Sequence, residues 1–281
     1  LEKILRVDGA TANIMIAIAL AIGTPFFLLF GWLSDRIGRK KIILAGCLLA
    51  ALTYFPLFNA LSKAVNPALY AAQANAPVTV IADPADCSIQ FDPLGKNKFD
   101  RKSCDITKSF LAKAGVSYAE QPAPAGEGTK LQIGIMAIPA PDPAMIPAAS
   151  RANEIRFFQL AAGARLKAAG YPEKADPAQI DKPLAIAILT LLVIYVTMVY
   201  GPIAAMLVEL FPARIRYTSM SLPYHIGNGW FGGFLPTIAF ATVAATGNIY
   251  SGLWYPVIVA LATVVIGALL LPETRDRPID A

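Results

Sequence analysis

Charged residues at two distant places in this chain could form ion pairs. Asp35 and Arg36 lie close to Arg39 in a short run between two apolar stretches, and Glu209 lies at the end of a third. Carboxylate and guanidinium groups form strong, charge-assisted hydrogen bonds where they meet. We expect Glu209 to be the partner of Arg36 and Arg39. The predicted cluster is Asp35, Arg36, Arg39, Glu209, Arg214 and Arg216.

Two glycines shape the run that carries Asp35. Gly31 has no side chain and allows the helix end to approach a neighbouring helix closely, and Gly38 permits a tight turn. Asp35 is an anion beside helix ends, where it can lie against the positive N-terminus of another helix. Alternatively, such charges only orient the chain in a membrane and meet lipid phosphates, and we favour that role for Lys40 and Lys41.

Polar residues within the apolar stretches are costly in lipid and are often functional. The chain has a single histidine, His225, which could act as a proton switch near neutral pH. Asn228 is three residues further on and shares its helix face. Packing of a hydrogen-bonded His225 is the competing interpretation. The candidates for a substrate or proton pathway are Asn13, Tyr195, Tyr200, Tyr224, His225 and Asn228.

Cys87 and Cys104 lie in the polar middle of the chain, whereas Cys47 lies in an apolar stretch. A middle region outside the cell would be in an oxidising compartment, so we expect Cys87 and Cys104 to form a disulfide. The sequence contains no glycine-rich phosphate loop, no metal-ligand spacing of Cys and His, and no nucleophile elbow. We therefore expect neither an enzyme nor a bound cofactor or metal.

The elements that would position these residues are membrane helices. The chain is 56% hydrophobic and only 15% charged, whereas soluble domains carry about 25% charged residues. A helix needs about 20 apolar residues to cross the hydrocarbon core. Stretches of this kind lie at residues 10–33, 42–61, 184–210, 217–244 and 252–271.

The basic residues predict the orientation of these spans. Short loops that stay in the cytoplasm are rich in Lys and Arg. The link between the first two spans, the link after Glu209 and the tail with Arg275 and Arg277 are basic, whereas the link between the last two spans is uncharged. The charge cluster would then lie at the cytoplasmic face. This pattern also argues against nucleic-acid binding, which needs basic residues on a soluble face.

Residues 62–182 form a long polar insert on the opposite, outer side of the predicted membrane. Residues 78–82 and 131–138 have the composition of strands, and residues 103–114 and 151–169 that of helices. Ser103 is a plausible helix cap, and the proline-rich segments 122–128 and 139–147 are expected loops. We predict a small α+β domain here. The domain boundaries are 1–61 for two helices with their basic loop, 62–182 for the insert, and 183–281 for three helices and a tail.

Two motifs carry a resemblance to a known family. The run from Gly31 to Lys40 reads G-x-L-x-D-R-x-G-R-K, which resembles the signature loop of the major facilitator superfamily. Tyr200-Gly201-Pro202, the run from Glu209 to Ser219, and Tyr224 to Asn228 resemble the tenth and eleventh helices of its metabolite:proton symporter branch. Pro272-Glu273-Thr274-Arg275 resembles the exit from the twelfth helix. The resemblance covers the five spans but not the insert.

The resemblance implies an all-α membrane protein: a partial C-terminal helical bundle with helices eight to twelve and a small α+β extra-membrane insert. We expect the N-terminal half of the same protein to precede Leu1 and to hold the main proton carrier. The resemblance also implies that the signature loop, with Gly31, Asp35 and Gly38, latches one conformation across the two halves.

The expected function is secondary active transport by alternating access, with a proton and a small organic metabolite such as proline or betaine, 2-oxoglutarate, citrate or shikimate carried together. The expected location is the plasma membrane, in bacteria the inner membrane, with the lipid bilayer around the helices. The alternatives are a membrane-embedded sensor or assembly protein whose insert binds a partner, or a fragment that is inactive by itself.

Overall fold

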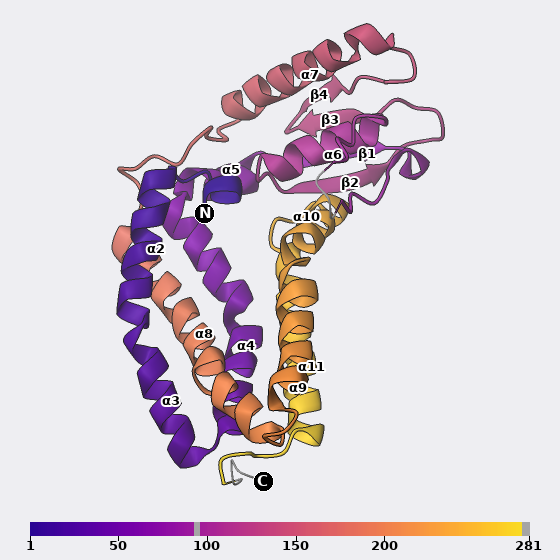
Figure 1. The fold of residues 1–281 in the computed structure, drawn as a ribbon. Coiled ribbons are helices and arrows are strands. Elements are labelled where there is room, and N and C mark those ends of the chain that lie inside the picture. Colours follow the sequence, from indigo (N-terminus) through magenta and orange to yellow (C-terminus); the bar gives the residue numbers. More distant parts are fainter. Residues whose placement is uncertain (93–95, 277–281) are drawn as a thin grey trace. The chain divides into compact units, whose positions relative to one another are not determined.

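The computed structural model describes residues 1–92 and 96–276 and is mainly helical (Figure 1). In this described part, five helical stretches are long and apolar enough to cross a membrane. In lipid every backbone polar group must find a partner within the segment, which explains why these stretches are helices. The stretches are Gly9–Ile37, Arg39–Val65, Lys182–Leu210, Arg216–Thr246 and Ser251–Leu270.

Proline interrupts the first span but not the next two. The first span consists of α2 (Gly9–Gly23) and α3 (Pro25–Ile37), and the break falls at Thr24, directly before Pro25. A proline lacks the backbone N–H that would continue the helix, and its ring restricts the preceding residue. In contrast, α4 (Arg39–Val65) runs through Pro56 and α8 (Lys182–Leu210) runs through Pro202.

The fourth span is not the uniform helix that its hydropathy predicts. It consists of α9 (Arg216–His225), the π-helical segment η2 (Ile226–Gly232) and α10 (Leu235–Thr246). The amide of Gly233 donates to the carbonyl of Asn228, five residues back, as a π-helix requires. A side chain on Gly233 would overlap the carbonyl of Gly229, so glycine is what permits this winding. The fifth span begins with the short 3-10 turn η3 (Ser251–Leu253) and continues as α11 (Trp254–Leu270).

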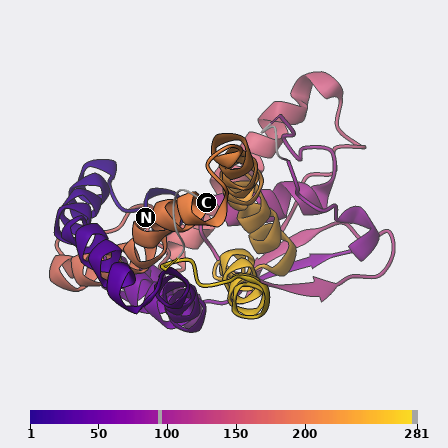
Figure 2. The same cartoon turned by 60° about the horizontal axis from the view of Figure 1, so that its bottom comes forward.

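Small residues bring neighbouring helices together. α3 packs along α8, and the two lie side by side in both views (Figures 1 and 2). A Cβ on Gly201 would lie 3.3 Å from the carbonyl oxygen of Phe27 and 3.4 Å from the amide nitrogen of Gly31. A Cβ on Gly46 of α4 would lie 3.3 Å from the carbonyl oxygen of Tyr195 of α8. Glycine therefore sets these close approaches, as is common where membrane helices pack.

The insert folds as a four-stranded sheet with helices. Its elements, in chain order, are α5 (Pro67–Asn75), β1 (Val78–Ala82), η1 (Pro84–Asp86), α6 (Ser103–Lys113), β2 (Tyr118–Pro122), β3 (Lys130–Ile133), β4 (Met136–Pro139) and α7 (Ala148–Ala168). The strand order is β2-β1-β3-β4. β1 pairs in parallel with β2, Val78 opposite Tyr118, and antiparallel to β3, Val80 opposite Leu131. The helix α1 (Glu2–Leu5) precedes the first span.

Several details of the insert differ from the sequence prediction. The single strand expected over residues 131–138 is a hairpin, because Gly134 with φ of 58° turns the chain between β3 and β4. Ser103 does not cap α6, since Lys102 holds the cap position and the Ser103 hydroxyl donates to the carbonyl of Pro141. β2 and α5 were not predicted at all, because neither has an apolar periodicity of its own.

The chain divides into two compact units that each contain separate segments of sequence. The first unit contains Leu1–Ala12, Ser62–Asp181 and Thr237–Gly252, and the second contains Asn13–Leu61, Lys182–Pro236 and Leu253–Ala281. Residues 1–12 and 237–252 therefore group with the insert, which the sequence-based boundaries did not anticipate. Within this unit a disulfide joins Cys87 to Cys104 of α6, with Cα atoms 5.1 Å apart.

Candidate functional site

Arg39 lies at the centre of a charge cluster in the second unit. It begins α4, directly after the turn that ends α3. Its Nη2 lies 3.0 Å from Oε1 of Glu209, and its Nη1 forms an ion pair with Asp35. The side chains of Arg39 and Glu209 are only 10% and 8% exposed, whereas Asp35 is 59% exposed. The cluster thus has a buried pair and an open carboxylate that share one guanidinium group.

Neutral hydroxyl groups complete the buried part of the cluster. Ser34 is fully buried, and its hydroxyl oxygen accepts a hydrogen bond of 2.7 Å from Nη1 of Arg39. Thr274 is fully buried as well, and its hydroxyl donates to Oε2 of Glu209 over 2.7 Å. A buried ion pair is stable only when its remaining donors and acceptors are also satisfied. Ser34 and Thr274 meet that requirement here.

Glu273 caps the N-terminus of α4. Its Oε1 accepts from the amide of Arg39 over 2.8 Å, and its Oε2 accepts from the amide of Lys40 over 3.2 Å. A carboxylate at this position satisfies orphan amides and interacts favourably with the positive helix end. Glu273 was not among the predicted cluster residues, and its position at α4 leaves the expected contact of Asp35 with another helix end a prediction. The Pro272–Arg275 motif was the available signal, since it lies on the same predicted face.

The two glycines of the run differ in what they do. Gly38 has φ of 111°, and a Cβ at this position would overlap the carboxylate of Glu273. Its lack of a side chain therefore allows the cap to reach α4. Gly31 was expected to permit a close helix approach, but a Cβ on Gly31 would meet nothing within 4 Å in the described residues. The close approach is made by Gly201, on which a Cβ would lie 3.4 Å from the amide nitrogen of Gly31.

Other contacts are made by the predicted residues Arg36 and Arg216. The guanidinium carbon of Arg36 lies 4.0 Å from the ring centroid of Trp32, a cation–π contact. Nε of Arg216 donates to the carbonyl of Phe211 over 3.1 Å, and Arg214 is exposed. Arg275, which was not in the predicted cluster, donates to the carbonyl of Arg36. Arg277 lies outside the described residues.

Arg275 also pairs with Asp276 next to the cluster. Its Nη2 lies 2.9 Å from Oδ2 of Asp276. The hydrogen bond from Arg275 lowers the pKa of Asp276, and the same bond raises the pKa of Arg275. Asp276 is therefore ionised near neutral pH. Because both groups are well exposed, this pair adds little to stability.

The structure brings only some of the pathway candidates together. The hydroxyl of Tyr200 on α8 donates to the side-chain oxygen of Asn228 in η2 over 3.1 Å. Tyr195 is buried, and its hydroxyl oxygen accepts from Thr53 on α4 over 3.1 Å. Asn13 and His225 are exposed on their helices, and Tyr224 packs edge-on against the His225 ring. The Tyr200–Asn228 pair at a π-helical segment is the most specific feature, since such segments occur frequently at functional sites.

The chain matches two protein families over segments that both supply cluster residues. Residues 1–79 match the family described as Major Facilitator Superfamily, and residues 157–281 match the family described as Sugar (and other) transporter. Asp35 and Arg39 fall in the first segment, and Glu209 and Glu273 fall in the second. Residues 80–156, which form most of the insert, lie between the two segments.

Curated relatives match over shorter lengths. A protein of Staphylococcus aureus (strain COL) named "Putative proline/betaine transporter" is 41% identical over 46 residues, 16% of this chain and 10% of the relative. A protein of the same name from Staphylococcus haemolyticus (strain JCSC1435) is 36% identical over 62 residues, 21% of this chain and 13% of the relative. The matches thus span about a tenth of these relatives' length. No solved structure matches the chain. The chain is therefore similar to transporter families on both sides of the insert, and its five apolar helices fit a multi-pass protein of the plasma membrane.

Proposed function

We propose that this chain supplies the last five helices of a secondary active carrier that moves a small organic metabolite together with protons. In this proposal a further helical half of the same protein encloses the substrate site, and the two halves alternate between inward-facing and outward-facing states. The charge cluster lies at the cytoplasmic face and the insert at the outer face. The positive-inside distribution of the short loops supports this orientation.

One observation carries the proposal: a single buried guanidinium group, that of Arg39, joins α4 to α8, and the carboxylate of Glu209 is in turn bonded to the tail after α11. Three separate segments therefore meet through one ion pair. In a static fold, a buried ion pair often contributes no more than apolar packing would. An ion pair contributes more to function when it forms in one conformation and opens in another, because it then favours one of the two states. Coupling of this kind is typically about 1–3 kcal/mol.

Asp35 is the part of the cluster that a second helical half could reach. It is 59% exposed although it already pairs with Arg39. We propose that its open side lies against a positive helix end of the other half in one state. Departure of that partner would leave the Asp35–Arg39 pair intact, so the cluster could switch without unpairing Arg39.

For the substrate we propose a small zwitterion of the proline or betaine type. The names of the two relatives support this class. Tyr200 and Asn228 offer a hydroxyl and an amide beside η2, which are neutral groups that suit a ligand without net charge. His225, Asn13, Tyr195 and Tyr224 complete the proposed pathway set.

Uptake by the complete protein in proteoliposomes tests the proposal. Labelled proline or betaine should accumulate when an inward proton gradient is imposed, and a protonophore should abolish the accumulation. Glu209→Gln should reduce the rate at least tenfold at equal protein abundance, because it removes a charge from the buried pair. The matched control is Glu154→Gln on the exposed face of α7, which should leave the rate unchanged. Equal uptake by the Glu209 variant and the control would contradict the latch.

Partner binding by the insert is a second candidate, which one feature of α7 favours. Phe157 and Leu160 are 65% and 60% exposed on the side of α7 opposite its buried residues Phe158 and Ala162. Exposed apolar residues that share a helix face can mark a binding surface. Phe157→Ser with Leu160→Ser should leave uptake unchanged if the protein is only a carrier. Loss of a cellular phenotype with normal uptake would instead support partner binding.

A further inference from the structure

The turn that follows α6 contacts two parts of the first unit that are far apart in sequence. We call residues 112–118 the junction turn. On one side it contacts the end of α10 and the loop that follows, residues 243–249. On the other side it contacts the N-terminal segment 1–8, which leads directly into α2. All of these residues belong to the same compact unit.

Tyr118 makes most of the polar contacts with α10. Its hydroxyl donates to the carbonyl of Ala244 over 2.6 Å, and its amide donates to the carbonyl of Gly247 over 2.7 Å. The hydroxyl oxygen of the neighbouring Ser117 accepts from the amide of Ile249 over 3.4 Å. Tyr118 is only 6% exposed, and its burial raises the pKa of its phenol, so this hydroxyl remains a donor at neutral pH.

Apolar packing and a glycine bring the two backbones into direct contact. Ala112 at the start of the junction turn packs with the buried residues Val243, Ala244 and Ile249. Gly247 has φ of 72°, and a Cβ there would overlap the carbonyl of Tyr118. Any side chain at residue 247 would therefore force the loop away from the insert.

The opposite side of the junction turn is fixed to the N-terminal segment. Nε of Arg6 donates to the carbonyl of Ala114 over 2.9 Å, and its guanidinium group also donates to the carbonyl of Pro172. Gly115 has φ of 62°, and a Cβ there would overlap the carbonyl of Ile4. The N-terminal segment thus meets the backbone of the insert as closely as the α10 loop does.

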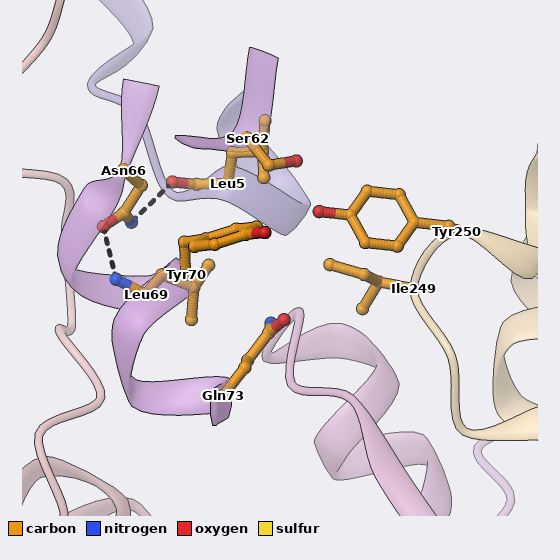
Figure 3. A pocket seen from close by; sticks show the side chains of 8 residues that line it. All are labelled: Leu5, Ser62, Asn66, Leu69, Tyr70, Gln73, Ile249 and Tyr250. Atoms are coloured by element: carbon orange, nitrogen blue, oxygen red, sulfur yellow. Dashed lines mark hydrogen bonds between the residues drawn. The ribbon is translucent and has the colours of Figure 1, made fainter. Parts of the chain in front are cut away.

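A further contact brings the end of α4 into the same assembly. Asn66, 1% exposed, donates from its side chain to the carbonyl of Leu5 over 2.9 Å and accepts from the amide of Leu69 over 3.0 Å. Figure 3 shows this pair of bonds beside a small pocket, with Ile249 and Tyr250 of the α10 loop across from α5. The segment that leads into α2, the residue that follows α4 and the end of α10 therefore each contact the junction turn or one another.

We infer that the junction turn is a clamp that makes the insert-side ends of α2 and α10 move as one body. Tyr118 and Gly247 act as positioning residues for α10 in this arrangement. The clamp consists of buried neutral hydrogen bonds and backbone contacts at glycine, apart from the guanidinium group of Arg6. Such contacts hold the two helix ends at a fixed separation, because close-packed groups resist displacement. The expectation that the two ends stay together during transport rests on the proposed function.

Hydrogen exchange of the purified complete protein tests the clamp without any transport assay. In Gly247→Ala, exchange of the Tyr118 and Ile249 amides should accelerate about tenfold or more, as expected when a net hydrogen bond and its packing are lost. The matched control is Gly126→Ala, since Gly126 has φ of 82° and a Cβ there would meet no described residue within 4 Å. It introduces similar backbone strain but should leave both amides unchanged. Should Gly247→Ala fail to fold, Tyr118→Phe provides a milder variant with the same expected direction.

Spin-label distances test the rigid-body claim. Labels at Lys3→Cys and Ala245→Cys, both exposed positions, are placed in a Cys47→Ala background. The distance distribution should be narrow and should not shift when substrate and a proton gradient are applied. It should broaden in Gly247→Ala but not in Gly126→Ala. A shift with conformation in the otherwise unaltered protein, or unchanged exchange in Gly247→Ala, would overturn the clamp. A lack of uptake would contradict the proposed carrier, whereas the hydrogen exchange and the spin-label distances would still test the clamp.

Discussion

The charge cluster and the junction turn both join distant segments, but they use different chemistry. At the cluster, one guanidinium group is shared by a buried and an exposed carboxylate. At the junction turn, buried backbone groups and a tyrosine hydroxyl bond to carbonyl oxygens, and two glycines allow backbones to touch. Water and a new partner can replace an ion pair at low cost when one member is exposed. Neutral groups buried in a packed interface have no such substitute, so the cluster suits switching and the junction turn suits permanent attachment.

Removal of the shared cation should produce the largest loss of stability, because both carboxylates of the cluster pair with it. Arg39→Gln leaves Glu209 buried without its cation, which we expect to destabilise the protein by about 3–5 kcal/mol. Thermal unfolding of the complete protein in detergent measures this loss. Glu209→Gln in the same background should recover part of the stability, because the unpaired charge is then gone. If the double variant is no more stable than Arg39→Gln, the loss of stability does not come from the unpaired charge of Glu209.

Removal of the disulfide should destabilise the insert and leave the charge cluster unchanged. Cys104→Ser opens the bond to Cys87, which closes a loop with a sequence separation of 17. We expect a loss of about 3 kcal/mol from the insert, by loop entropy. Exchange of β1 amides should accelerate, while the amides of Arg39 and Lys40, which Glu273 caps, should keep their protection. Equal acceleration at both places would show that the two regions are energetically coupled.

Gly38 and Gly126 allow a matched test of backbone strain against specific contact. Both have positive φ, but only at Gly38 would a Cβ overlap another group, the Glu273 carboxylate. Gly126→Ala should cost about 1 kcal/mol from strain alone, whereas Gly38→Ala should cost about 2–3 kcal/mol because the α4 cap is displaced as well. Unfolding curves for the two variants measure the difference. Equal losses would mean that the cap contributes nothing.

Asp35→Asn should have the smallest effect on stability, below about 1 kcal/mol, because the carboxylate is mostly exposed. Under the latch proposal its transport rate should nevertheless fall clearly. Asp276→Asn, another exposed acid that pairs with an arginine, is the matched control for charge. The latch proposal predicts that only the Asp35 variant loses transport at equal abundance. If the two variants transport alike, Asp35 contributes to the pair with Arg39 and to nothing else.

The sequence predicted the spans and part of the cluster for physical reasons that are local. Long apolar stretches specify membrane helices because lipid leaves the backbone no other partner. The pairing of Arg39 with Glu209 followed from the placement of basic loops, which puts both residues on one face. Glu273 and Thr274 were missed as cluster members because their role depends on where the chain turns after α11. Ser34 was missed because a serine at a helix end has many possible partners.

Less of the insert than of the membrane spans could be predicted from the sequence. Its disulfide and the strand β1 could be expected from composition, whereas β2 and the junction turn could not. Tyr118, which begins β2, and the loop residues Gly115 and Gly247 share no motif, and their roles arise only where two backbones come into contact. Such contacts depend on the three-dimensional path of the chain and leave no local pattern in the sequence.

The sequence alone specifies how much of this protein must be in lipid, which loops are basic, and which glycine- and arginine-containing motif precedes α4. These properties follow from side-chain polarity, which acts residue by residue. The tertiary structure decided which carboxylate caps α4, which arginine is buried, and which glycines allow backbones to touch. Those outcomes depend on distances of a few ångströms between segments far apart in sequence, such as Arg39 and Glu273, which are 234 residues apart, and only the folded chain fixes such distances.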